Sequence, residues 1–154
     1  MLMEMSLNYS IICERLDELN RVVKFKKRSR LSKDFTEDFQ NYLIIMSALD
    51  GYISIDDVNQ INLILGTSWT GIEIKSYVEE KHILDEEFMS TVPSSLKQVL
   101  ALENKIGNSQ LSDFIISFFN KIAELFSVNT RQIDFYNKYI SLIRDYREGI
   151  GGNE

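Results

Sequence analysis

The chain has 154 residues, 44% of them hydrophobic and 26% charged, a balance typical of one globular domain and not of a disordered chain. The net charge of -6 disfavours nucleic acid and anionic lipid as partners and favours a neutral or basic protein. One Pro and seven Gly are too few turn residues for a β-sandwich or barrel. No apolar run reaches the roughly 18 residues of a membrane-spanning helix, and a single Cys rules out an intrachain disulfide.

The first two predicted helices carry long apolar stripes. The N-terminal stripe is spaced four, three, four, three and four residues apart, which is the repeat of one helix face. We expect this helix to fill residues 1–31 and to end in a basic segment. The second helix is expected to begin at an N-cap, Ser32 or Asp34, and to lie centrally, because apolar residues cover most of its circumference. The stripes are Met5, Tyr9, Ile12, Leu16, Leu19 and Val23, then Phe35, Phe39, Tyr42, Met46 and Leu49.

Paired capping residues mark the starts of the third and fourth helices. A Ser or Thr followed three residues later by an acid has the spacing of a capping box. Gly66 stands where the third helix should end, and the fourth should end near His82. The acidic segment 84–91 is weakly patterned and predicts at most a short helical turn. The two capping pairs are Ser54 with Asp57 and Thr70 with Glu73.

Three further helices complete the prediction. One begins around Pro93, which a first helical turn tolerates, and stops at the break over residues 107–109. The next carries a stripe rich in Phe, and Asn129 with Gln132 then caps the last helix. Residues 149–154 are expected to be a frayed tail. We therefore predict an all-α fold, a single compact bundle of about seven helices forming one domain over residues 1–154.

A short internal repeat accompanies two of these helix starts. Residues 53–58 align with residues 128–133, and each segment follows an apolar helix and opens another. The match predicts two related helix-turn-helix halves packed in one bundle. Chance could also produce a match this short.

An apolar helix that runs into Asp50-Gly51, a short turn and a new helix from Ser54 form the most distinctive part of the chain. With segments 88–96 and 118–146, this pattern resembles the TerB-like (tellurite-resistance B-like) family of small all-helical domains, over roughly residues 35–147. The resemblance implies that fold and an adaptor-like role. Family members have acids in both turns, from which a metal or metalloid response is inferred. Here Asp50 and Asp57 match the first turn, whereas Arg131 and Gln132 replace acids in the second.

The first turn has two interpretations. Asp50, Asp56 and Asp57 offer oxygen ligands to a divalent cation, which would make this a metal-responsive domain. The spacing is not that of an EF-hand, because its third and twelfth positions would be Tyr52 and Ile61. The alternative is a structural turn, in which Asp50 accepts backbone N–H groups and Asp57 completes a cap.

A basic cluster stands against the acidic remainder of the chain. Five of the seven residues 24–30 are basic. They predict either a docking patch for an acidic protein surface or a cationic helix end that complements the helix dipole. Trp69, just before a helix start, predicts a hydrophobic staple or a partner anchor. The predicted partner-binding residues are Lys24, Lys26, Lys27, Arg28, Arg30 and Trp69.

Reactive groups are scarce. His82 and Cys13 are the only residues of their types, and neither has a neighbour in sequence that would complete a zinc site or a nucleophile–base set. We expect no catalytic residue and no required cofactor. The expected function is that of a cytoplasmic protein-interaction module, such as an adaptor, inhibitor, immunity or anti-defence protein, with the metal-responsive domain as the alternative. The Ile, Asn and Lys usage suggests a low-GC bacterium or its phage, no signal peptide is apparent, and the first stripe permits a homodimer.

Overall fold

Eight helices account for most of residues 2–22, 30–126 and 129–152, the part of the chain that this computed structural model describes, and no strand occurs among them. Seven helices have eleven residues or more and one has four, which confirms the predicted all-α bundle and its short acidic turn. The helices are α1 (Leu2–Val22), α2 (Leu31–Ala48), α3 (Ile55–Leu65), α4 (Gly71–Lys81), α5 (Glu86–Met89), α6 (Ser94–Ile106), α7 (Gln110–Phe126) and α8 (Thr130–Gly152).

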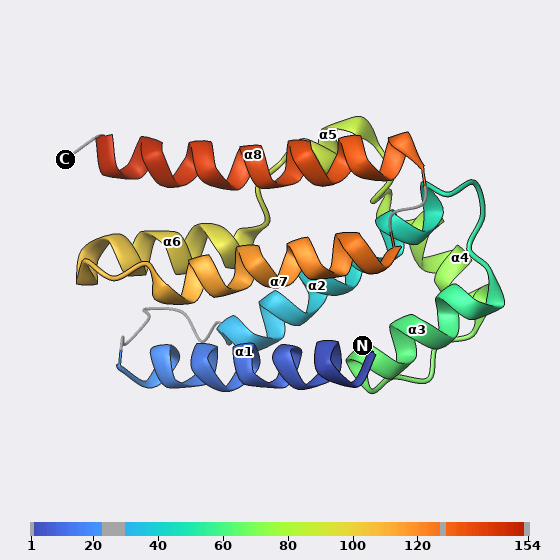
Figure 1. The fold of residues 1–154 in the computed structure, drawn as a ribbon, viewed down its shortest axis with the longest axis horizontal. Coiled ribbons are helices and arrows are strands. Elements are labelled where there is room, and N and C mark those ends of the chain that lie inside the picture. The colour runs from blue at the N-terminus through green and yellow to red at the C-terminus, as the bar shows by residue number, and fades with distance from the viewer. Residues whose placement is uncertain (1, 23–29, 127–128, 153–154) are drawn as a thin grey trace.

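The long helices stack in layers (Figure 1). Helices α1 and α8 lie on opposite sides, with α2, α6 and α7 between them. Helices α3 and α4 lie together at one end of the stack. None of the helices in the described part of the chain combines the length and apolar character needed to cross a bilayer.

Helix α2 is the centre of the core, as its broad apolar surface predicts. Every residue from 41 to 47 is buried, and α2 contacts α1, α3, α6 and α7. The ring of Tyr42 in α2 lies 4.7 Å from that of Phe119 and 4.8 Å from that of Tyr139. Burying such a side chain contributes roughly 1.5–3 kcal/mol, so this aromatic cluster is a main source of stability.

The start of α2 differs from the prediction. The helix begins at Leu31, so Ser32 and Asp34 lie inside it and the expectation that either is the N-cap is wrong. The Leu31 N–H donates instead to Oδ1 of Asn20 at 3.0 Å, and Ser32 Oγ donates to Oδ1 of Asp17 at 2.6 Å. One of the free N–H groups at the start of α2, that of Leu31, is thus satisfied from α1, which only packing brings into reach.

The caps of the third and fourth helices are confirmed. Ser54 and Asp57 each accept a backbone N–H from the other, at 3.0 and 2.9 Å. Thr70 and Glu73 do the same at 3.2 and 3.1 Å. Gly66 ends α3 with a φ of 68°, the left-handed conformation for which Gly carries no steric penalty.

The end of the chain is more helical than predicted. Helix α8 continues through Gly152, so the expectation of a frayed tail is wrong for residues 149–152, while 153–154 lie outside the described residues. Ile150 is partly buried against the core. Such an apolar contact offsets the cost of about 1 kcal/mol that a Gly brings to a helix.

Candidate binding pocket

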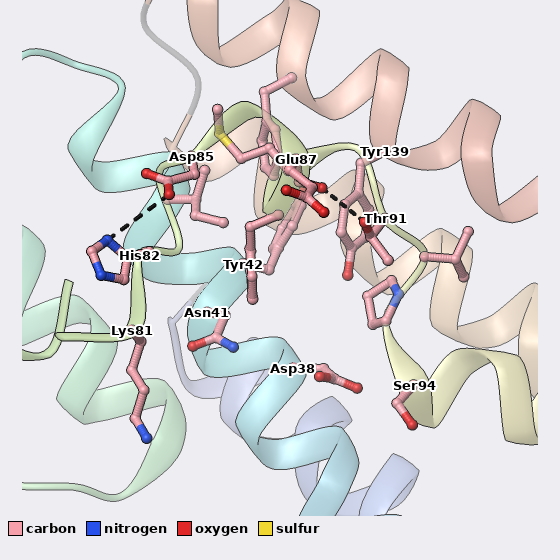
Figure 2. Close-up of a pocket in the computed structure, with 16 residues that line it drawn as sticks. Asp38, Asn41, Tyr42, Lys81, His82, Asp85, Glu87, Thr91, Ser94 and Tyr139 are labelled. Carbon is pink, nitrogen blue, oxygen red and sulfur yellow. Dashed lines mark hydrogen bonds and ion pairs between the residues drawn. The ribbon is translucent and has the colours of Figure 1, made fainter. Parts of the chain in front are cut away.

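A pocket of about 460 Å³ lies beside α2, closed by the segment 82–94 and by α8 (Figure 2). This volume falls within the range of typical small-ligand sites, about 300–1,000 Å³. Its walls are mainly apolar, and its floor carries polar groups from α2 and α8. The apolar lining residues are Tyr42, Ile45, Phe88, Met89, Val92, Pro93 and Phe135.

Segment 82–94, hereafter the covering segment, owes its path to local backbone chemistry. His82 ends α4 in the left-handed conformation, with a φ of 54°, which turns the chain away from the helix. The four-residue α5 follows, and Thr91 Oγ1 donates to the Glu87 carbonyl at 2.8 Å (Figure 2). Pro93, with a φ of -59° and a ψ of 143°, then holds the chain extended before α6 begins. The segment therefore bends over the pocket.

Asp38 joins the pocket floor to the start of α6. Its Oδ2 accepts from the Ser95 N–H at 3.0 Å and from Ser95 Oγ at 2.5 Å. Burial raises the pKa of the Asp38 carboxyl, the Ser95 hydrogen bonds oppose that rise, and the nearby Glu37 and Asp34 charges add to it. Within the described part of the chain, Oδ1 has no hydrogen-bond donor, so half of this carboxylate is uncommitted.

Tyr139 brings a second uncommitted group to the pocket. Its side chain is 6% exposed, and no described residue hydrogen-bonds to its hydroxyl. Burial raises its pKa well above the ordinary value, and the charge of Asp38 raises it further. Figure 2 shows the hydroxyl directed toward the side of the pocket where Asp38 lies. Such orphaned polar groups are rare in folded proteins and call for an explanation.

Asn41 is the third polar residue of the floor. Its Oδ1 accepts from the Tyr77 hydroxyl at 2.6 Å, while its amide nitrogen donates to none of the described residues. Asn41 lies one turn after Asp38 on the same face of α2. The arrangement can hold a ligand group that both donates and accepts hydrogen bonds.

The histidine at the pocket rim does not form a catalytic set with its neighbours. His82 is exposed, and its Nδ1 lies 3.9 Å from Asp85 Oδ2, which is too long for a hydrogen bond. Among the described residues, no hydroxyl or thiol hydrogen-bonds to the imidazole. The pocket lining combines apolar side chains with charged and hydrogen-bonding groups.

The three predicted metal ligands are not brought together. Asp50 Oδ1 accepts from the Asn129 amide at 3.2 Å, Asp57 closes the α3 capping box, and Asp56 is exposed in the first turn of α3. Across the described residues, no three His, Cys, Asp or Glu side chains form a group able to hold a metal ion. In this turn Asp57 closes a cap, as the structural interpretation predicts, whereas the hydrogen bond that Asp50 accepts comes from a side-chain amide and not from a backbone N–H.

The second turn packs onto the first through its cap residues. Gln132 is 1% exposed; its Oε1 accepts from the Asn129 N–H at 3.1 Å and its Nε2 donates to the Met46 carbonyl at 2.7 Å. Asn129 also donates to the Leu49 carbonyl at 3.2 Å. These bonds satisfy carbonyl groups at the end of α2. A carboxylate at position 132 could not donate to Met46, which gives a physical reason for the amide there.

The structure describes only some of the predicted partner-binding residues. Lys24, Lys26, Lys27 and Arg28 lie outside the described residues, and Arg30 is exposed immediately before α2.

Trp69 stands immediately before the Thr70 cap, the position of a hydrophobic staple. Its indole N–H donates to Gln40 Oε1 at 3.2 Å, and its ring lies 5.6 Å from that of Tyr77. It is partly buried against the core, so these contacts tie Trp69 into the fold.

Sequence analysis missed the three floor residues. Asp38 and Asn41 offered a weak signal, because they lie one helix turn apart beside the apolar stripe of this helix. Tyr139 offered none, since a single Tyr in an apolar stripe is ordinary core material.

Comparisons with protein-family models, with curated proteins and with solved structures found no match. The TerB-like resemblance therefore stays a prediction, and the pocket has to be interpreted from its own chemistry.

Proposed function

We propose that this protein is a non-catalytic, TerB-like interaction module whose pocket beside α2 receives part of a partner protein, as an adaptor or inhibitor would. The observation that carries the proposal is the pocket itself. Its apolar walls surround the buried Tyr139 hydroxyl, which has no hydrogen-bond partner among the described residues, and the partly buried Asp38, which uses one oxygen. Recognition sites have this composition, an apolar cavity with a few convergent polar groups that fix orientation.

The rim of the pocket supports a protein as the occupant. On the covering segment, Phe88 is 40% exposed and Leu84 is 37% exposed. Large apolar side chains held at the surface next to a pocket are typical of protein contact sites, where an apolar centre is ringed by polar residues. The acidic residues Asp85 and Glu87 on the same segment provide that polar surround.

The test is affinity capture from the native host with three forms of the protein. Thr91→Trp places a large ring at the exposed pocket lining, while Ser117→Trp adds the same ring at an exposed site on α7, outside the pocket. We expect the parent and Ser117→Trp to retain a stoichiometric protein partner that Thr91→Trp loses. Equal capture by Thr91→Trp, or no stoichiometric partner for any form, would contradict the proposal.

A further inference from the structure

The pocket floor has unused hydrogen-bonding capacity of a particular kind. When the Asp38 carboxyl is ionised, its Oδ1 acts only as a hydrogen-bond acceptor. The Tyr139 hydroxyl can accept a hydrogen bond as well. A ligand group with several N–H donors matches the acceptor character that the two groups share. Ammonium and guanidinium groups carry three and five such donors and no acceptor.

The charges around the pocket also favour a cation. Asp38, Asp85 and Glu87 line it, against the single full positive charge of Lys81. Glu37 lies close enough to Asp38 to act on its charge. The chain as a whole carries a net charge of -6. An anionic ligand would meet like charge at the floor and from the whole molecule, whereas a basic one would be attracted.

The walls suit a cation carried on an apolar stem. Tyr42, Phe88, Phe135 and Tyr139 line the pocket, and the Tyr42 ring lies 5.7 Å from that of Phe135 and 4.8 Å from that of Tyr139. Aromatic rings attract cations, and the methylene chains of Lys and Arg pack on apolar surface while their charged ends stay solvated or paired.

We infer that the pocket binds a lysine or arginine side chain from a basic segment of the partner, with its charged end at Asp38 and Tyr139 and its stem against the aromatic wall. This inference rests on the proposed interaction role and names the chemistry of the partner. The complementarity between the acidic chain and a basic segment selects this occupant over an acidic or neutral one.

The test is an NMR titration of the full chain with probes that carry a short straight alkyl stem and differ in their end group. The probes are n-butylammonium, n-butylguanidinium, butyrate and 1-butanol, followed by a short peptide with one Lys between Leu residues. We expect saturable shifts of the pocket resonances with both cations and binding weaker by about tenfold or more with butyrate and butanol. The Lys peptide should bind more tightly than n-butylammonium, because its Leu residues add contacts at the rim.

Variants assign the effect to the floor. Asp38→Asn removes the charge, while its amide oxygen can still accept both Ser95 hydrogen bonds, so the start of α6 is kept. Cation binding should weaken by about tenfold or more in this variant. Glu14→Gln makes the same change in net charge on α1, which lines no part of the pocket, and should bind like the parent. Tyr139→Phe should weaken binding by a few fold, because one hydrogen bond is lost.

Three results would overturn the inference: no saturable shift with either cation, butyrate or butanol binding as tightly as the cations, or Asp38→Asn binding like the parent. A peptide weaker than n-butylammonium would also overturn it, because the occupant would then be a free small amine. If Thr91→Trp loses the captured partner and Asp38→Asn retains it, the proposed function stands and this inference is overturned. Cationic probes that bind at the floor when no partner is captured would end the proposed function and leave only the preference of the pocket for cations.

Discussion

Buried and partly buried polar residues serve two purposes in this protein. Gln132 uses both ends of its amide within the fold, which is typical of a residue that specifies structure. Asp38 uses one oxygen, and the Tyr139 hydroxyl makes no hydrogen bond to any described residue. Ser47 and Tyr139 carry the two buried hydroxyls that have no hydrogen-bond partner among the described residues, and of the two only Tyr139 lines the pocket. Because unsatisfied buried groups are costly, we assign Tyr139 to binding, together with Asp38 beside it in the pocket lining.

Tyr139→Phe should stabilise the free protein. The substitution removes a buried hydroxyl that lacks a partner among the described residues, and such a group costs about 1–3 kcal/mol. We expect the free energy of unfolding to rise by about 1 kcal/mol in urea denaturation. Tyr42→Phe is the matched control, since its hydroxyl donates to the Phe119 carbonyl at 3.3 Å and its loss should lower stability. A loss of stability in Tyr139→Phe would show that the hydroxyl is satisfied in solution.

The pKa of Asp38 predicts a pH dependence of stability. Burial raises this pKa in the folded state above the ordinary 3.8, so the folded protein binds the proton more tightly than the unfolded chain does. Stability contributed by the protonated form is therefore present below pH 3.8 and is lost as the pH rises through the raised pKa. Asp38→Asn does not titrate, so its melting temperature relative to the parent should increase from about pH 3 to about pH 7. Glu14→Gln is the control, because it shows how the loss of one charge at an exposed position changes the melting temperature. A melting difference that is flat or falls over this range would contradict the assignment.

At the scale of elements, backbone groups at several helix ends are hydrogen-bonded by side chains of other helices. Asn20 of α1 accepts the first N–H of α2, and Gln132 at the start of α8 donates to a carbonyl at the other end of α2. Glu103 of α6 accepts the N–H groups of Leu111 and Ser112 in α7. These contacts fix where helices begin and end relative to one another.

Gln132→Glu should destabilise the protein. At neutral pH the new carboxylate cannot donate to the Met46 carbonyl, and it buries a charge at a 1% exposed position. We expect a loss of about 2 kcal/mol or more in chemical denaturation. The loss should shrink at acid pH, where a protonated Glu can donate again. Gln110→Glu is the control, because it adds the same charge at the exposed start of α7 and should change stability by less than about 0.5 kcal/mol. Equal effects of the two changes would contradict the bridging role of Gln132.

The turn between α2 and α3 gives a prediction about metals. Asp50 and Asp57 are engaged by Asn129 and by the Ser54 N–H, and no group of potential metal ligands forms among the described residues. We therefore expect millimolar Ca²⁺ to leave the melting temperature unchanged, because a ligand must bind the folded state preferentially to stabilise it. A rise that Asp57→Asn abolishes would restore the metal-responsive alternative.

At the scale of the whole molecule, α1 belongs to the single core. It packs against α2, α3 and α7, and Met5, Ile12 and Leu16 on it are fully buried. The Tyr9 hydroxyl lies 2.6 Å from Thr36 Oγ1 on α2. The helix that the TerB-like resemblance leaves out is thus built into this fold.

Leu16→Ala should destabilise the entire domain. The side chain is 0% exposed, and such truncations cost about 2–5 kcal/mol. We expect one cooperative urea transition shifted to lower concentration, since the core is shared. Leu7→Ala removes the same atoms on the same helix at a 61% exposed position and should change stability by less than about 0.5 kcal/mol. A separate early transition of α1 would contradict a single cooperative domain.

The sequence by itself determined the features that depend on near neighbours. Helix class, the Ser54 and Thr70 caps, the end of α3 at Gly66 and the central place of α2 all follow from side-chain periodicity and from hydrogen bonds spanning a few residues. Tertiary structure decided the rest. The cap of α2 comes from Asn20, Asp38 meets Ser95 across 57 positions, and Gln132 meets Met46 across 86. No local pattern encodes such pairs, because they depend on which helix faces pack together. The pocket forms where α2, α4, α6 and α8 meet the covering segment, so its chemistry became visible only in the folded chain.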